Sequence, residues 1–153
     1  MAAFFCDSSA IVKRYVTETG SAWIATIAAP KAGNRIYVAR ITFVEVISAI
    51  SRREKGGNLT MTDANNACSN FEQDFLNQFR NVEINEDLLG KAAQLAKKYA
   101  LRGYDAVQLA AALETENERN NSGLSSLTFL SADADLNTAA VSEGLPVDDP
   151  NDH

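Results

Sequence analysis

The sequence contains few of the residues that supply nitrogen and sulfur to enzyme and metal sites. Among its 153 residues are one histidine, His153, and two cysteines, Cys6 and Cys68. A histidine at the last position is poorly placed for chemistry, so mechanisms that need a positioned imidazole are excluded. The cysteines lack CxxC spacing, so the sequence predicts neither a disulfide framework nor a zinc site. We expect both to be reduced packing residues.

Basic residues and long apolar runs are also scarce. Twenty acidic residues against fourteen basic ones give a formal net charge of -6, which excludes a broad basic face that coats nucleic acid. No stretch approaches the roughly 18 apolar residues of a membrane span, and the first apolar run stops at Asp7, too early for a signal-peptide core. The sequence therefore predicts a cytoplasmic protein without a membrane partner.

Short apolar strands alternate with amphipathic helices along the chain. This alternation predicts an α/β fold, a three-layer α/β/α sandwich with a central, mainly parallel sheet. Residues 1–147 are expected to form one domain, and residues 148–153 an acidic, disordered tail. Strands are predicted at 4–6, 36–38, 82–84, 127–131 and 145–147, and helices near 10–16, 21–29, 42–55, 60–79, 86–102, from 105 onward and at 136–141.

An aromatic stripe marks the longest polar helix. Phe71, Phe75 and Phe79 recur every four residues, which places them on one face. A stripe of this kind is typical of a core, and contact with a partner protein is the alternative.

Four acidic residues fall where ligands bind in an open parallel sheet, beyond the carboxyl ends of the strands. Asp7 and Asp133 follow strands, Glu45 lies in the first turn of a helix that follows a strand, and Asp105 opens another helix. Clustered carboxylates repel one another unless a cation neutralises them, and oxygen ligands suit Mg²⁺ or Mn²⁺. A site of this kind without histidine indicates metal-assisted phosphate chemistry.

Each of these acids also has a purely structural interpretation. Asp7 is suited to a turn or a helix cap, and Asp105 to an N-cap. Glu45 completes a capping-box pattern with Thr42.

The joint pattern resembles the PIN domain, and specifically the VapC toxins of bacterial toxin-antitoxin pairs. The run Asp7-Ser8-Ser9-Ala10-Ile11-Val12-Lys13 is similar to the first motif of that family. Glu45 stands at the second acid, the run Asp105-Ala106-Val107-Gln108-Leu109-Ala110 resembles the third motif, and Leu130-Ser131-Ala132-Asp133 resembles the fourth. The resemblance spans Phe4 to about Val147. One departure is Gln108, at a position that is often histidine in relatives.

The resemblance implies a metal-dependent endoribonuclease that hydrolyses RNA phosphodiester bonds, leaves a 5′-phosphate and is the toxin of a type II toxin-antitoxin pair. Its catalytic residues and ligands for Mg²⁺ or Mn²⁺ would be Asp7, Glu45, Asp105 and Asp133. Asp135 is the alternative for the last acid. Ser9 and Ser131 would be supporting hydroxyls.

The family also implies partners, namely RNA, a small antitoxin protein and a second copy of the chain in a homodimer. Candidate RNA-binding bases are Lys13, Arg14 and Arg40, with Arg52 and Arg53 also near the acids; the alternative is that they are solvated helix residues. Aromatic and basic residues are not interleaved, so no RNA-stacking platform can be recognised.

The sequence can be compared with three other functions. A stand-alone PIN nuclease in RNA processing and a non-catalytic PIN-like binding protein stay open, although acids at all four positions disfavour the second. A phosphatase of the haloacid-dehalogenase type needs a second aspartate two residues after Asp7, where this sequence has Ser9.

Overall fold

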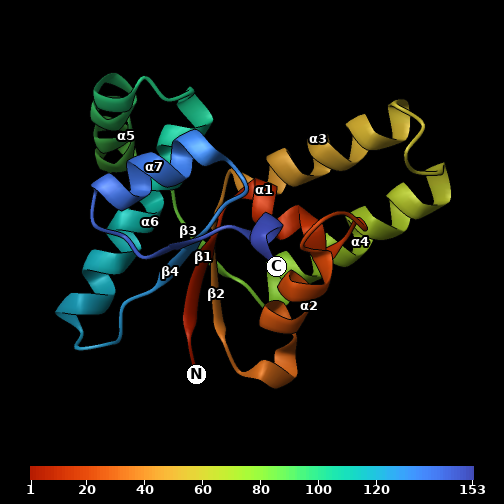
Figure 1. Ribbon diagram of the computed structural model, residues 1–153, viewed down its shortest axis with the longest axis horizontal. Helices are drawn as coiled ribbons and strands as arrows, with labels where there is room; N and C mark the ends of the chain where they lie inside the picture. The colour runs from red at the N-terminus through yellow and green to blue at the C-terminus, as the bar shows by residue number, and fades with distance from the viewer.

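Five short strands form one wholly parallel sheet in the order β3-β2-β1-β4-β5 (Figure 1). The structure is a computed structural model that describes residues 1–153. β1 lies at the centre and pairs on one side with β2 and on the other with β4. The strands are β1 (Ala3–Cys6), β2 (Arg35–Ala39), β3 (Arg80–Val82), β4 (Thr128–Leu130) and β5 (Val147–Asp148).

Alternate side chains of the central strands enter two separate cores. Phe5 and Phe129, paired across β1 and β4, stack with ring centroids 6.0 Å apart on one face of the sheet. Their neighbours Cys6 and Leu130 enter the core on the opposite face. Both faces of the sheet are thus buried, as the apolar strands require.

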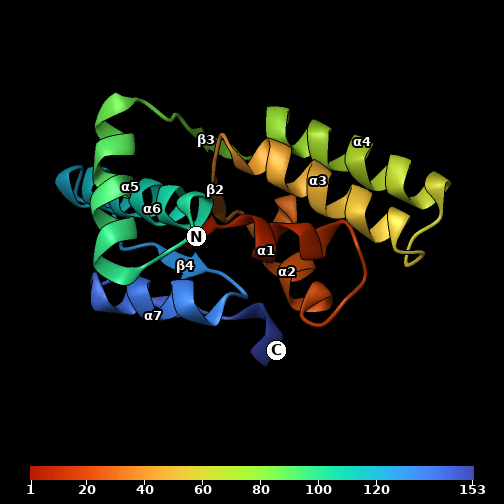
Figure 2. The ribbon, with the colours of Figure 1, turned by 90° about the horizontal axis from the view of Figure 1, so that it is seen from above.

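Helices cover both faces of the sheet, and Figure 2 shows them as two groups on either side of the strands. This arrangement confirms the predicted three-layer α/β/α sandwich. One layer contains α1 (Ser8–Ile11), the 3₁₀ turn η1 (Val12–Arg14), α2 (Ser21–Ala28), η2 (Pro30–Ala32), α3 (Thr42–Lys55) and α4 (Met61–Asn77). The other contains α5 (Glu86–Tyr99), α6 (Gly103–Asn121) and α7 (Ala134–Ser142).

The phenylalanine stripe of α4 lies in the core. Phe71, Phe75 and Phe79 are all buried. Phe43 of α3 packs against the first two, with ring centroids 6.1 Å and 5.1 Å away. The expectation of a core stripe is confirmed.

Some element boundaries differ from the sequence prediction. The third strand is Arg80–Val82 instead of 82–84, because Arg80, Asn81 and Val82 pair with β2 while Asn85 caps α5 through its side chain. The last strand is Val147–Asp148, which pairs with the end of β4.

The expectation of a disordered tail at residues 148–153 is wrong. Asp148 pairs within the sheet, and Pro150–Asp152 forms the 3₁₀ turn η3 beside α2, where Pro150 is buried. The His153 ring stacks on Trp23 with centroids 3.9 Å apart. These tertiary contacts order a segment whose local composition favours disorder. No helix of the structure is long and apolar enough to span a bilayer.

Candidate active site

The four predicted acids lie at one edge of the sheet. Asp7 directly follows β1, Asp133 follows β4, and Glu45 lies in the first turn of the helix after β2. Asp105 lies in the first turn of α6. From β1 the chain adds β2 and β3 on one side of the sheet and then β4 and β5 on the other side, so the topological switch point lies between β1 and β4. Open α/β sheets bind ligands in the crevice at such a switch point.

Asp7 is buried at the centre of this edge, and its carboxylate accepts three hydrogen bonds. Oδ1 accepts from Ser9 Oγ at 2.7 Å and from the Ala10 backbone N–H at 2.9 Å, and Oδ2 accepts from Ser131 Oγ at 2.7 Å. Burial raises the pKa of Asp7 to about 7, although the three donors partly oppose the increase. Asp7 is therefore the N-cap of α1, which confirms its structural interpretation. Its ionised form is also destabilised by burial.

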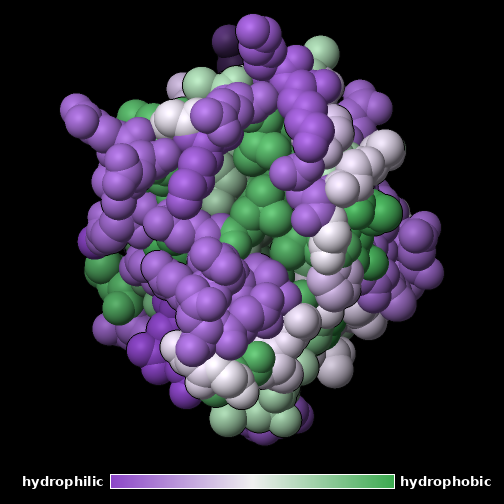
Figure 3. Space-filling model, turned by 90° about the vertical axis from the view of Figure 1, so that its left-hand side faces the viewer, coloured by the Kyte–Doolittle hydropathy of each residue, from purple (hydrophilic) through white to green (hydrophobic).

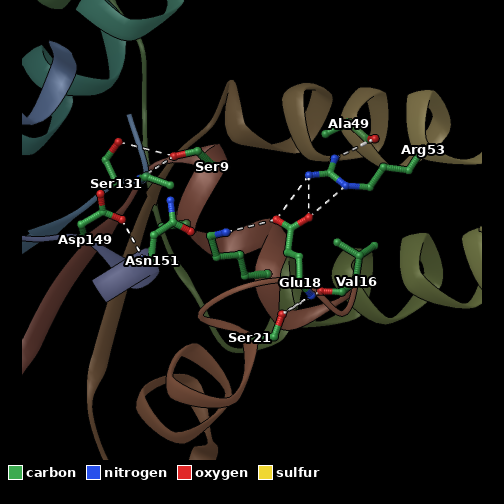
Figure 4. Close-up of polar contacts among 12 residues, drawn as sticks. Ser9, Val16, Glu18, Ser21, Ala49, Arg53, Ser131, Asp149 and Asn151 are labelled. Atoms are coloured by element: carbon green, nitrogen blue, oxygen red, sulfur yellow. Dashed lines mark hydrogen bonds and ion pairs between the residues drawn. The ribbon is translucent and has the colours of Figure 1, made fainter. Parts of the chain in front are cut away.

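The hydroxyls of Ser9 and Ser131 connect β1 to β4. Ser9 Oγ accepts from the Ala132 backbone N–H at 2.9 Å, and Ser131 Oγ accepts from the Asp133 backbone N–H at 3.1 Å. Both hydroxyls also donate to Asp7, and their oxygens lie 3.4 Å apart (Figure 4). Asp7 is consequently held in one orientation by Ser9 in the adjacent turn and by Ser131, which lies 124 positions away in the sequence.

Glu45 is held by Gln108, for which the sequence predicts no role in the site. Gln108 Nε2 donates to Glu45 Oε1 at 2.7 Å and to Thr42 Oγ1 at 2.9 Å, and Ser8 Oγ donates to Glu45 Oε2 at 3.3 Å. Partial burial raises the pKa of Glu45, and the bonds from Gln108 and Ser8 lower it in part. Thr42 does not cap α3, whose N-cap is Ile41, so the capping-box interpretation is wrong.

Gln108 itself is buried, and its Oε1 has no hydrogen-bond partner. Both hydrogen bonds of the amide are donated by Nε2, to Glu45 and Thr42, so the Gln108 side chain holds the Glu45 carboxylate against the start of α3. In the sequence, Gln108 is marked only as a polar residue between Val107 and Leu109, within the run that resembles the third motif. Neither feature identifies Glu45 as the residue that it contacts.

Asp105 and Asp133 line a hollow of about 240 Å³ between α6 and α7. Asp105 is half-buried, and burial and the negative charge of Asp133 raise its pKa. Its carboxylate does not cap α6, whose N-cap is Arg102 without a side-chain bond, so the capping interpretation of Asp105 is wrong. Asp133 caps α7 by accepting from the Leu136 backbone N–H at 3.0 Å. Asp135 lines the same hollow, but of these two acids only Asp133 raises the pKa of Asp105, while Arg102, 3.8 Å away, lowers it in part.

The acids form a series in which each repels the next. The charge of Glu45 raises the pKa of Asp7, that of Asp105 raises the pKa of Glu45, and that of Asp133 raises the pKa of Asp105. Within this series a basic side chain pairs only with Asp105, through the exposed Arg102, and oxygen donors that repel one another fit a hard divalent cation. No three histidine, cysteine, aspartate or glutamate side chains of the structure are gathered closely enough to hold one metal ion.

Most of the basic residues predicted to contact RNA are paired within the protein. Lys13 is buried, and its Nζ lies 3.3 Å from Glu18 Oε1, so Lys13 is committed to an interior ion pair. Arg53 Nη2 lies 3.0 Å from Glu18 Oε2 and forms the other side of this cluster (Figure 4).

Two more of the predicted bases, Arg14 and Arg40, are also paired. Arg14 Nε lies 3.4 Å from Asp74, and the guanidinium also donates to the Ala28 carbonyl. Arg40 is exposed but pairs with Glu83 at 2.9 Å. Among the five bases near the acids, Arg52 alone has no carboxylate partner, and it donates to Ser48 Oγ at 2.9 Å.

Comparison with known proteins agrees with this geometry. Residues 4–141 match the PIN domain family. Two ribonucleases of Mycobacterium tuberculosis, VapC45 (strain CDC 1551 / Oshkosh) and VapC49 (strain ATCC 25618 / H37Rv), are each 34% identical over 113 residues, or 74% of this chain and 76% of the relative.

Solved structures share the fold at low sequence identity. The Sarcin-Ricin loop cleaving toxin VapC20 of Mycobacterium tuberculosis superposes with a TM-score of 0.62 at 14% identity, covering 93% of this chain and 95% of that one. VapBC2 from Rickettsia felis, bound to a DNA fragment from its promoter, gives 0.62 at 10% identity, covering 96% and 98%. The matched span contains the switch-point acids, and the chain therefore belongs to the PIN-domain family, where it resembles the ribonucleases called VapC.

Proposed function

We propose that this protein is a metal-dependent endoribonuclease that hydrolyses RNA phosphodiester bonds and leaves a 5′-phosphate, and that it is the toxin of a type II toxin-antitoxin pair. The observation that carries the proposal is the series of mutually repelling carboxylates at the switch point of the sheet. Its relatives at 34% identity are ribonucleases, which supplies the reaction class. The same proposal places the protein in the cytoplasm, where its RNA substrate is found.

In this proposal Asp7, Glu45, Asp105 and Asp133 hold Mg²⁺ or Mn²⁺, with rotation of the more exposed side chains toward Asp7. A bound divalent cation supplies Lewis-acid activation of water and neutralises charge on the phosphate. The chain contributes orientation: the serine hydroxyls fix Asp7, and Gln108 and Ser8 fix Glu45. Side chains held in this way need little reorganisation during the reaction.

A cleavage assay with substituted acids tests this proposal. Purified protein is incubated with total cellular RNA, with Mg²⁺ or with excess chelator, and the products are separated on a gel. We expect cleavage with Mg²⁺ only, and its loss in Asp105→Asn, which removes a charge without changing the side-chain shape. Asp135→Asn tests the choice of the fourth acid and is expected to cleave, and Glu72→Gln, on the exposed face of α4, is the matched control. Cleavage in chelator or by Asp105→Asn contradicts the metal mechanism.

The antitoxin and the homodimer are separate parts of the proposal. A solved structure of the same fold is a VapBC2 assembly, which supports a partner of the antitoxin kind. We expect a short reading frame for a DNA-binding protein immediately upstream of the gene, and its co-expressed product to relieve growth arrest. A stand-alone nuclease would have no such neighbour. Light scattering of the purified protein measures whether two copies associate.

Figure 3 shows a surface relevant to this association. On the side that bears α5, α6 and α7, hydrophobic side chains lie between hydrophilic ones. A hollow of about 280 Å³ there includes Leu95, Ala110 and Leu113, with Lys91 and Lys98 also lining it. Apolar surface rimmed by polar residues is typical of association sites, and it supports the dimer without assigning the contact.

A further inference from the structure

A groove of about 490 Å³ extends from Glu45 along α3. Its inner end includes Glu45 and Ser8, which belong to the site described above. Its outer part includes Val44, Tyr104 and Arg52, which have no role in holding the acids. The groove is within the volume range of small-ligand sites and is continuous with the crevice where the phosphodiester would be cut.

The outer wall of the groove is aromatic and aliphatic. The Tyr104 side chain, adjacent to Asp105 at the start of α6, is 64% exposed, and Val44 on α3 is 66% exposed. Neither side chain contributes to the two cores of the fold. A solvent-facing ring beside an aliphatic side chain provides a surface on which a nucleobase stacks.

A free cation lies at the same groove. The Arg52 side chain is exposed, and its guanidinium donates to Ser48 Oγ at 2.9 Å. Ser48 lies one turn after Glu45 on α3, and Arg52 one turn after Ser48. No carboxylate pairs with Arg52. The neighbouring Arg53 is not available, since Glu18 Oε2 accepts from its Nε at 3.2 Å and from its Nη2 at 3.0 Å (Figure 4). The groove thus pairs one unneutralised guanidinium with an apolar wall, a combination that matches the phosphate and the base of a nucleotide.

We propose that this groove binds one unpaired nucleotide of the RNA substrate, next to the phosphodiester that is cut, with its base against Tyr104 and Val44 and a phosphate on Arg52. The proposal rests on the proposed ribonuclease function and adds to it the residues that position the nucleotide beside the cut. A base inside a duplex is stacked on both sides and cannot enter the groove, so a duplex serves as the comparison in the test. RNA is favoured over a protein segment because Arg52 has no carboxylate partner to neutralise it, and because the inner end of the groove is Glu45, one of the acids proposed to hold the divalent cation that binds phosphate.

Binding measurements test this subsite apart from cleavage. The probe is a fluorescein-labelled, single-stranded RNA eight nucleotides long with mixed sequence, and the parent protein carries Asp105→Asn so that the probe stays intact in Mg²⁺. Anisotropy gives Kd. We expect Tyr104→Ala to raise Kd about 5- to 150-fold, the loss of roughly 1–3 kcal/mol for one stacked base, and Tyr104→Phe to stay within about twofold. A duplex of the same sequence should bind more weakly than the single strand.

The salt dependence tests the cation. Arg52→Ala should lower the magnitude of the slope of log K against log salt concentration by about 0.7–1, because one phosphate contact is lost. Arg52→Lys keeps the positive charge and should keep the slope of the parent. The matched controls are Arg35→Ala, on an exposed arginine at the opposite end of β2, and Leu76→Ala, on an exposed leucine of α4. Both controls should bind like the parent.

The outcomes separate the two proposals. If unsubstituted protein cleaves RNA but Tyr104→Ala and Arg52→Ala bind the probe like the parent, the groove proposal is wrong and the nuclease stands. The groove proposal is also overturned if the duplex binds as tightly as the single strand, or if the parent shows no measurable binding. It is likewise overturned if the substitutions weaken binding of a co-expressed antitoxin and leave RNA binding unchanged. If unsubstituted protein cleaves no RNA with any divalent metal, the proposed function itself is wrong.

Discussion

Asp7→Asn is expected to stabilise the metal-free protein. Burial raises the pKa of Asp7 from its model-peptide value of 3.8 to about 7. At 1.36 kcal/mol per pKa unit, the ionised carboxylate costs the folded state about 4 kcal/mol at pH 8. Asparagine removes the charge and keeps the shape, and its amide can accept from Ala10 and donate to Ser131 Oγ.

The sign of the pH dependence follows from the raised pKa. Between about pH 4 and 7 the folded state holds the Asp7 proton more tightly than the unfolded state, so stability falls as pH rises through this range. The advantage of Asp7→Asn should therefore be near zero at pH 4, grow through pH 6 and reach its full size at pH 8. For a chain of this length, about 2–4 kcal/mol corresponds to roughly 5–15 °C in Tm.

Thermal and urea unfolding in chelator at pH 4.5, 6 and 8 measure this advantage, with Glu72→Gln as the exposed control. In Mg²⁺ the order should reverse, because a cation that binds only the folded, ionised site stabilises the unsubstituted protein by mass action. The reasoning is refuted if Asp7→Asn is less stable than the unsubstituted protein in chelator at pH 8, or if the difference does not change with pH.

Three further substitutions have defined outcomes. Gln108→Leu removes a hydrogen-bond donor that lowers the pKa of Glu45. Single-turnover cleavage should therefore slow at least about tenfold, and the acidic limb of its pH profile should move to higher pH. The circular dichroism spectrum should be unchanged. Gly20→Ala places a Cβ 2.2 Å from the Pro150 carbonyl oxygen at a residue with φ of +85°, so it should cost about 1–3 kcal/mol in urea unfolding and expose the C-terminal segment to protease. Phe71→Ala empties a fully buried site and should cost about 3–5 kcal/mol in the same unfolding measurement.

Matched controls distinguish these effects from general damage. Gln73→Leu, on an exposed glutamine of α4, should leave the pH profile unchanged. Gly123→Ala also has a positive φ, of +70°, but meets no atom within 4 Å, so it isolates backbone strain from the clash. Leu76→Ala, on a 71% exposed leucine, should leave stability nearly unchanged. An unaffected C-terminal segment in Gly20→Ala, or a pH profile unmoved by Gln108→Leu, would contradict the corresponding argument.

The alternation of strands and helices could be read from the sequence because each element carries a local signal. Apolar runs such as residues 127–131 and the four-residue spacing from Phe71 to Phe79 report burial directly. The positions of Asp7, Glu45 and Asp133 after strands likewise place these three acids at one edge of any parallel sheet, whereas Asp105 follows a helix and was placed with them by the motif it resembles. These inferences need only the chain order and the period of the pattern.

Features that depend on tertiary partners could not be read in this way. Lys13 lies between polar and apolar residues like any helix-surface lysine, and only the fold places it in the interior beside Glu18. Gln108 reaches Thr42 across 66 positions, which no local pattern encodes. The order of residues 148–153 depends on Trp23 and on the small size of Gly20, and the exposure of Tyr104 depends on how α6 begins.

The hydrogen bond from Ser131 to Asp7 joins residues 124 positions apart. β1 is made first, but Ser131 and Asp133 directly follow β4, which pairs with β1 and is made after Asp7, Glu45 and Asp105. During synthesis, the growing chain therefore carries three of the four acids before the fourth exists. In the proposed ribonuclease the site is incomplete until β4 and Asp133 have been made, so the growing chain cannot cut RNA before that point.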